Sequence, residues 1–98
     1  MNHKYSILQI KNHSSLKNFA DYRWLTERLG GFDIADYETV YEGEFDSGDD
    51  IDVILDNIFE IFNIDHPSDF RGHSLSVSDV VVIDGVKYYC DSIGWKNV

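Results

Sequence analysis

The sequence is short of the residues that several classes of protein depend on. Its 98 residues include one cysteine, Cys90, which excludes an internal disulfide and therefore a disulfide-stapled secreted domain. No apolar run reaches the roughly 18 residues of a membrane-spanning helix, and a single proline excludes a proline-rich linker. The N-terminal MNHKYSILQIKNH lacks the apolar core of a signal peptide. We therefore expect a cytoplasmic protein that does not contact the membrane.

Basic residues are also scarce. The chain has 18 Asp and Glu residues against 8 Lys and Arg residues, which gives a formal net charge of −10. Because phosphate contacts require Lys or Arg, this balance argues against direct binding of DNA, RNA or anionic lipid and is compatible with a basic partner. The chain is nevertheless 43% hydrophobic and 14% aromatic, which is typical of a folded domain rather than of disorder. We expect residues 1–98 to form one domain.

The acidic residues are concentrated in the middle of the chain. Residues 21–69 hold 15 acidic residues and two basic ones, and residues 36–52 hold eight acidic residues and no basic one. Blocks of like charge are often interaction segments, although many simply keep a surface solvated. Here the acidic residues alternate with core-type residues, which indicates a folded acidic face rather than a tail.

Hydrophobic periodicity predicts a small α+β domain. The expected elements are strands at 3–10, 37–45, 74–83 and 86–90, and helices within 15–30 and at 50–63. The start of the first helix stays open between Ser15 and Asp21, and Asp84-Gly85 is a hairpin turn signal. The order β-α-β-α-β-β, with a further short strand left open at Gly94 and Trp95, predicts two helices packed on a mostly antiparallel sheet.

The second strand and the second helix each have an acidic side. In the strand, alternation places Tyr37, Thr39, Tyr41, Gly43 and Phe45 on one face and Glu38, Val40, Glu42, Glu44 and Asp46 on the other. In the helix, the buried stripe would be Ile51, Ile54, Leu55, Ile58, Ile61 and Phe62. The candidate partner-binding residues are the acidic ones: Glu38, Glu42, Glu44, Asp46, Asp49, Asp52, Asp56 and Glu60.

The spacing of these carboxylates suggests a nucleic-acid mimic. Same-face residues on a strand lie roughly 6.6–6.8 Å apart, comparable with the spacing of consecutive phosphates. On the helix, neighbours in the row Asp52, Asp56 and Glu60 would lie about 5–6 Å apart. Such a surface would compete for a groove built for nucleic acid. The alternative is an acidic face that does no more than contact solvent.

A second cluster of reactive residue types lies in the loop at 66–73. His66, Asp69, Arg71 and His73 have the composition of a general acid–base pair with an anion clamp, as an RNA-cleaving site would need, or of a metal site. The more common reading is that they hold the loop by hydrogen bonds. Because the chain lacks zinc-ligand and phosphate-loop spacings, we expect no cofactor, no metal and no catalytic residue. The stretch DSGDDID also lacks the calcium-loop pattern, and Cys90 reads as a core residue.

Two segments of the chain carry a family resemblance. HPSDFRGHSLSVSDVVV at 66–82 and YYCDSIGW at 88–95 resemble the YodL-like domain of Firmicutes mobile elements. The stretches YSILQI, ADYETVYEGEF and IFNIDHPSDF are similar in the same order, so the resemblance covers nearly the whole chain. The family usually has Asp-Ser-Phe-Gly where this chain has Asp-Ser-Ile-Gly at 91–94. His66, Asp69, Arg71 and His73 match the motif, which indicates membership and not catalysis.

The resemblance implies a function. Some stand-alone proteins that look like this chain are anti-CRISPR proteins directed at type II effectors, so a non-enzymatic inhibitor of a single-subunit RNA-guided DNA nuclease in the bacterial cytoplasm is expected. An acidic protein would be steered toward the basic channels of such a nuclease and would hinder guide-RNA loading or DNA binding. The alternatives are a ribonuclease that trims guide RNA, and a protein-interaction or antirestriction module of a conjugative element.

Overall fold

The computed structural model describes residues 2–12, 14–46, 50–64, 68–70, 72 and 74–98. Its elements, in chain order, are β1 (Asn2–Ile10), α1 (Tyr22–Arg28), a 3-10 helix (Ile34–Asp36), β2 (Tyr37–Asp46), α2 (Ile51–Ile64), β3 (Val80–Ile83), β4 (Val86–Cys90) and β5 (Trp95–Asn97). This order confirms the predicted α+β class with two helices. The short strand that the sequence left open at Trp95 is present as β5.

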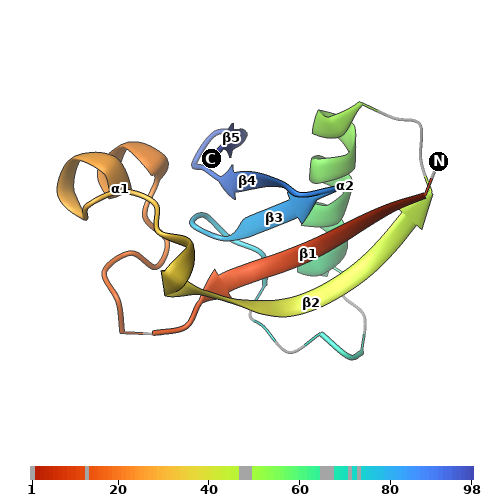
Figure 1. The fold of residues 1–98 in the computed structure, drawn as a ribbon, viewed down its shortest axis with the longest axis horizontal. Coiled ribbons are helices and arrows are strands. Elements are labelled where there is room, and N and C mark those ends of the chain that lie inside the picture. Colours follow the sequence, from red (N-terminus) through yellow and green to blue (C-terminus); the bar gives the residue numbers. More distant parts are fainter. Residues whose placement is uncertain (1, 13, 47–49, 65–67, 71, 73) are drawn as a thin grey trace.

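The sheet has five antiparallel strands in the order β2-β1-β3-β4-β5. The longest strand, β2, therefore lies at one edge, and β1 lies between β2 and β3. Figure 1 shows the helix α2 behind this sheet, whereas α1 lies at the far end of the strands. The two helices consequently cover different parts of the sheet, and each has its own apolar cluster.

The larger cluster lies between α2 and one face of the sheet. The buried side of α2 consists of Ile54, Leu55, Ile58 and Phe62. These side chains pack against Ile7 of β1 and against Val81 and Ile83 of β3, with Tyr5, Tyr41 and Phe45 at the margin. Most of the predicted stripe is confirmed, because apolar residues at three- and four-residue steps share one face of a helix. Ile61 is the exception, with 46% of its surface exposed.

The smaller cluster lies on the opposite face of the sheet, at the end where α1 packs. It joins Leu8 and Ile10 of β1 to Leu25 of α1 and Tyr89 of β4. The Tyr89 hydroxyl donates a 2.6 Å hydrogen bond to the carbonyl of Ala20, which ties β4 to the start of α1. This cluster covers only the end of the strands near Ile10, so the other half of this sheet face is left open.

The first helix is shorter than its apolar spacing suggests. It begins after Asp21, whose carboxylate accepts a 2.7 Å hydrogen bond from the main-chain N–H of Trp24 as an N-cap. Phe19 has a φ of 64°, which a helix cannot accommodate, and its N–H donates to Ser78 Oγ at 2.9 Å. Of the two starts that the sequence left open, Asp21 is therefore confirmed and Ser15 is not, and Leu16 and Phe19 lie outside the helix at 80% and 63% exposure.

The strand predicted at 74–83 is confirmed only over Val80–Ile83. Ser78 has a φ of 84°, and the Asp79 carboxylate accepts a 2.8 Å hydrogen bond from the N–H of Ser76. A serine–aspartate turn of this kind satisfies the main chain locally and competes with strand pairing. The β-branched pattern therefore gives the right strand but places its start too early.

A β-bulge divides the predicted aromatic face of β2, so the prediction holds from Tyr41 to Phe45 and is wrong for Tyr37 and Thr39. The register passes from Ile7 opposite Tyr41 to Leu8 opposite Thr39, so Val40 is an extra residue on β2. One extra residue reverses the alternation of side chains along a strand. Tyr37 consequently packs in the α1 cluster, whereas Tyr41 and Phe45 pack in the α2 cluster.

Candidate partner-binding surface

The acidic residues of β2 lie on the open half of the sheet. Glu42, Glu44 and Asp46, which we call the β2 row, are all exposed. Their neighbours Tyr41 and Phe45 pack toward α2, so the alternation of the strand turns the three carboxylates to the opposite face. The β2 row is therefore a real run of same-face carboxylates, as the sequence predicts.

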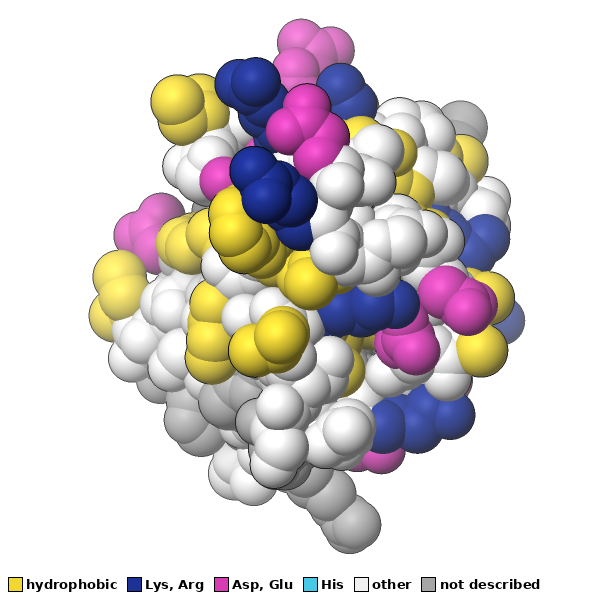
Figure 2. All heavy atoms as spheres, turned by 90° about the vertical axis from the view of Figure 1, so that its left-hand side faces the viewer, with side chains coloured by type: hydrophobic (Ala, Val, Ile, Leu, Met, Phe, Trp, Pro, Cys, Tyr) yellow, Lys and Arg dark blue, Asp and Glu magenta, His cyan; other side chains and the backbone are white. Residues whose placement is uncertain are grey.

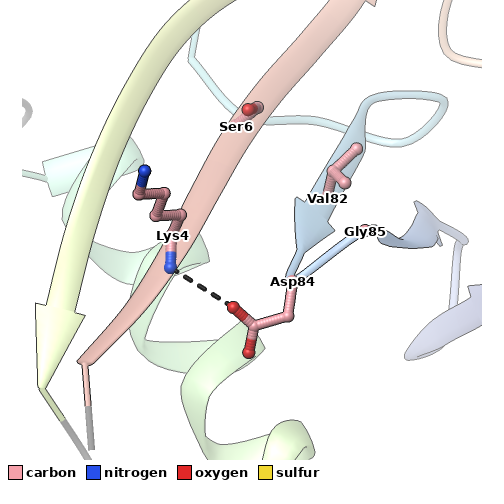
Figure 3. A pocket seen from close by; sticks show the side chains of 5 residues that line it. All are labelled: Lys4, Ser6, Val82, Asp84 and Gly85. Carbon is pink, nitrogen blue, oxygen red and sulfur yellow. Dashed lines mark hydrogen bonds between the residues drawn. The ribbon is translucent and has the colours of Figure 1, made fainter.

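The open half of the sheet also carries a basic residue. Lys4 lies opposite Glu44 in the antiparallel register and is exposed. Figure 3 shows a shallow pocket on this face, lined by Lys4, Ser6, Val82, Asp84 and Gly85. A second shallow hollow, beside Glu42 and Glu44, shares Lys4 and Ser6. The surface is thus polar and acidic, with Lys4 near its centre and a second cation, Lys87 of β4, on the same face opposite Val82.

Asp84, in the turn between β3 and β4, is fixed in this pocket by two hydrogen bonds. Its carboxylate accepts a bond from His3 Nδ1. It also accepts a 3.4 Å bond from the main-chain N–H of Lys4, which Figure 3 shows as a dashed line. The bond to His3 is the main cause that lowers the pKa of the Asp84 carboxyl. Asp84 is therefore a carboxylate at neutral pH and adds negative charge to the open half.

The acidic residues of α2 lie on a different side of the molecule. Asp52, Asp56 and Glu60, which we call the α2 row, are exposed and lie on the side of the helix away from Leu55 and Phe62. Because α2 covers the sheet face opposite the β2 row, the predicted acidic set is divided between two faces. No basic residue occurs in α2, so the α2 row is uninterrupted.

Two further candidates do not join either row. Glu38 precedes the bulge at Val40, so it does not share the alternation of the β2 row, although it is exposed. Asp49 lies outside the described residues. Of the loop cluster, His66, Arg71 and His73 also lie outside them, whereas Asp69 is described and exposed. The predicted ribonuclease arrangement is therefore not tested by the structure.

The end of the molecule that carries α1 is not part of an acidic face. Figure 2 looks onto this end, where hydrophobic side chains lie among those of Lys, Arg, Asp and Glu. Trp24 is half-exposed, and the Arg28 guanidinium lies 5.4 Å from the centre of its ring. The pair forms a cation–π contact on the surface rather than part of the core.

A buried polar cluster that sequence reasoning missed joins β1 to the turn at 76–79. Asp79 is 1% exposed, and its carboxylate accepts hydrogen bonds from Gln9 Nε2 at 3.0 Å and from Ser76 N–H at 2.8 Å. A Cβ on Gly72 would lie 2.2 Å from Gln9 Oε1, so only glycine allows this approach. Tyr37 donates a 2.6 Å hydrogen bond to the Ser78 carbonyl. The feature of the sequence that could have indicated this cluster is the position of the polar Gln9 among apolar residues, on a strand that is buried on both faces.

Cys90 is confirmed as a core residue, at 4% exposure. Burial, with Asp79 and Asp91 nearby, raises the pKa of its thiol to about 12. A thiol reacts as its thiolate, so we expect no reaction with dithiobis(nitrobenzoate) near pH 8 in the folded protein and complete reaction in urea. Absorbance of the released thiolate measures both rates. Rapid labelling without urea would contradict the burial of Cys90.

Two properties of the described residues bear on the site. No cluster of three or more His, Cys, Asp or Glu side chains in them is arranged to hold a metal ion. None of the helices in the described part of the chain has the length and apolarity needed to cross a membrane.

The arrangement of elements and the sequence can now be compared with known proteins. The YodL-like domain family matches residues 4–98, which include all the described helices and strands except the first two residues of β1. This chain belongs to the YodL-like domain family. The match includes the 68–79 segment of the YodL-like domain, where Asp79, Gln9 and Gly72 meet. Neither the curated proteins nor the solved structures contain a match to the chain.

Proposed function

We propose that this YodL-like domain is a non-enzymatic anti-CRISPR protein that binds a type II RNA-guided DNA nuclease and hinders guide-RNA loading or DNA binding. The observation that carries the proposal is the exposure of two ordered carboxylate rows, one on β2 and one on α2. Both rows lie on regular elements, which hold the charges at fixed spacing without a cost in ordering a loop. The formal net charge of −10 supports the same conclusion.

The proposed mechanism is electrostatic attraction between the acidic domain and a basic partner. Guide RNA, heteroduplex and displaced strand run through positively charged channels of such a nuclease. An acidic domain is steered to these channels, and charge complementarity affects the association rate more than the final affinity. The α2 row is the stronger candidate for contact because the helix has no basic residue, whereas Lys4 lies opposite Glu44 beside the β2 row.

Gel filtration of the domain with a type II nuclease tests this proposal directly. The domain is added before guide RNA and, separately, after it, and an absorbance ratio reports bound RNA. Co-elution with the RNA-free nuclease and loss of RNA would indicate a block of guide loading. Co-elution only with the loaded nuclease would place the contact at the DNA-binding surface. No co-elution in either order would contradict the proposal, and a shortened guide RNA would favour the ribonuclease alternative.

Two matched variants identify the contact row. One carries Asp52→Asn, Asp56→Asn and Glu60→Gln, and the other carries Glu42→Gln, Glu44→Gln and Asp46→Asn. Neutralising the row that contacts the nuclease is expected to slow association by about tenfold or more at low salt, and the other variant serves as the control. Stopped-flow or surface plasmon resonance at two salt concentrations measures the effect. Wild-type association rates for both variants would show that the electrostatic mechanism is wrong.

A further inference from the structure

An apolar groove lies between the edge strand β2 and one side of α2. It has a volume of about 270 Å³ and is lined by Tyr5, Glu44, Phe45, Ile54, Asn57, Ile58 and Ile61. Ile61 is 46% exposed at the rim, whereas Ile58, one turn earlier on α2, is buried. The groove adjoins the polar hollow beside Glu42 and shares Tyr5 and Glu44 with it, but its remaining lining residues are Phe45 and residues of α2.

Gly43 affects this groove through Tyr5, which is one of its lining residues. It lies in β2 opposite Tyr5 of β1, and a Cβ at Gly43 would lie 2.8 Å from the Tyr5 ring. The absence of a side chain therefore lets the aromatic ring of the inner strand extend over the edge strand. Burial, with Tyr41 and Asp69 nearby, raises the pKa of Tyr5 to about 12, so its side chain is neutral at physiological pH.

The main chain of β2 faces outward beside the groove. The carbonyl of Lys4 in β1 accepts a hydrogen bond from the Asp84 N–H, so the main-chain groups of Lys4 point toward β3. Antiparallel pairs alternate, so Ser6, two residues later, points the same way, and its partner Glu42 directs its own N–H and C=O to the outer edge. The described residues place no strand beyond β2. An edge strand beside an apolar groove is the arrangement that binds a peptide by strand addition.

The charge of the β2 edge distinguishes between two possible occupants of the groove, a second copy of this chain and a basic segment of another protein. A second copy of this chain, pairing β2 with β2, would bring acidic side chains of the β2 row next to one another, which is destabilising. An extended segment with Lys or Arg on the corresponding face would instead pair with these carboxylates. Charge complementarity therefore favours a basic partner strand over self-association.

We propose that the β2–α2 groove binds an extended segment of a partner protein, which adds to the sheet beyond β2. Its side chains facing α2 are apolar and lie against Phe45 and Ile61. Its side chains facing the open half of the sheet are Lys or Arg and lie beside Glu42. This site is independent of the proposed nuclease target, because any protein with such a segment would satisfy it.

A synthetic peptide of alternating valine and lysine is the probe for this site. Titrated into the isotope-labelled domain, it is expected to shift the amide signal of Glu42 and to slow the hydrogen exchange of that amide. A peptide of alternating valine and glutamate is the control and is expected not to bind. An unchanged Glu42 amide, or equal binding of the acidic peptide, would overturn the proposal. The nuclease is absent from this assay, so its result is separate from that of the proposed function.

Two substitutions on α2 locate the binding. Ile61→Asp places a charge at the rim of the groove and is expected to weaken peptide binding by about tenfold or more, because it disrupts the apolar contact. Val53→Asp is the matched control, since Val53 is also 46% exposed on α2 but does not line the groove. Circular dichroism verifies that both variants are folded. If both variants bound the peptide as tightly as the wild type, or more tightly, the peptide would bind by charge alone and not in the groove.

Discussion

Replacing Phe62 by alanine is expected to lower the free energy of unfolding by about 3–5 kcal/mol, measured by urea denaturation. Phe62 is fully buried on α2 and lies at the centre of an aromatic group. Its ring centroid lies 4.9 Å from that of Phe70 and 5.2 Å from that of Tyr41, both at edge-to-face angles. The substitution removes these contacts and leaves a cavity. Since a domain of this length is stable by about 5–15 kcal/mol, the loss is a large share of the total.

The matched control is Phe59→Ala, on the same helix. Phe59 is 38% exposed, and its one close ring contact among the described residues is Trp95, at 6.3 Å. We expect this variant to lose about 1 kcal/mol or less, because little apolar surface is uncovered. If the two variants lost equal stability, the packing of Phe62 between the sheet and the 68–70 segment would not be the main source of core stability.

The regular parts of this fold follow from local sequence. The spacing of apolar residues in 50–63 predicts α2 because a single periodic stripe faces a single sheet. The β-branched run before Asp84-Gly85 and the alternation after it predict the β3–β4 hairpin for the same reason. Both elements satisfy their main-chain hydrogen bonds by regular pairing and form as predicted, although the turn at Ser78 and Asp79 moves the start of β3 to Val80.

The errors occur where distant contacts determine local geometry. The N–H of Phe19 bonds the side chain of Ser78, which lies 59 residues away, and this contact accompanies the positive φ that precedes α1. The extra residue at Val40 depends on how β2 registers against β1. Neither feature has a local sequence signal. Apolar spacing therefore overestimates α1, and simple alternation assigns Tyr37 to the wrong face.

The candidate site also combines features that local sequence predicts with features that depend on distant contacts. The sequence predicts that the β2 row and the α2 row are acidic and exposed, because each lies opposite an apolar face of its own element. Whether the two rows share a surface depends on which side of the sheet α2 covers, and charge pattern carries no such information. The groove beside β2 was not predicted at all, since it needs Gly43, Tyr5 and Ile61 to meet in space.

Replacing Asp79 by alanine is expected to destabilise the domain by about 3 kcal/mol. The carboxylate is buried and accepts hydrogen bonds from Gln9 Nε2 and Ser76 N–H. Its removal leaves these two donors without that acceptor, and each buried donor left unpaired costs about 1–3 kcal/mol. Urea denaturation measures the loss. Asp69→Ala is the control from the same segment, because Asp69 is exposed and its removal should change stability by about 0.5 kcal/mol or less.

A double-mutant cycle tests whether Asp79 and Gln9 stabilise the domain together or independently. If Asp79 and Gln9 act together, Gln9→Ala with Asp79→Ala should cost less than the sum of the two single variants, by about 0.5–3 kcal/mol. Additive losses would mean that the hydrogen bond between them contributes little. A cooperative result would indicate that Asp79 and Gln9 serve folding rather than catalysis. Gly72 fits this role, because it is needed for the close approach to the same Gln9 amide. Binding variants on β2 and α2 could then be designed without altering this cluster.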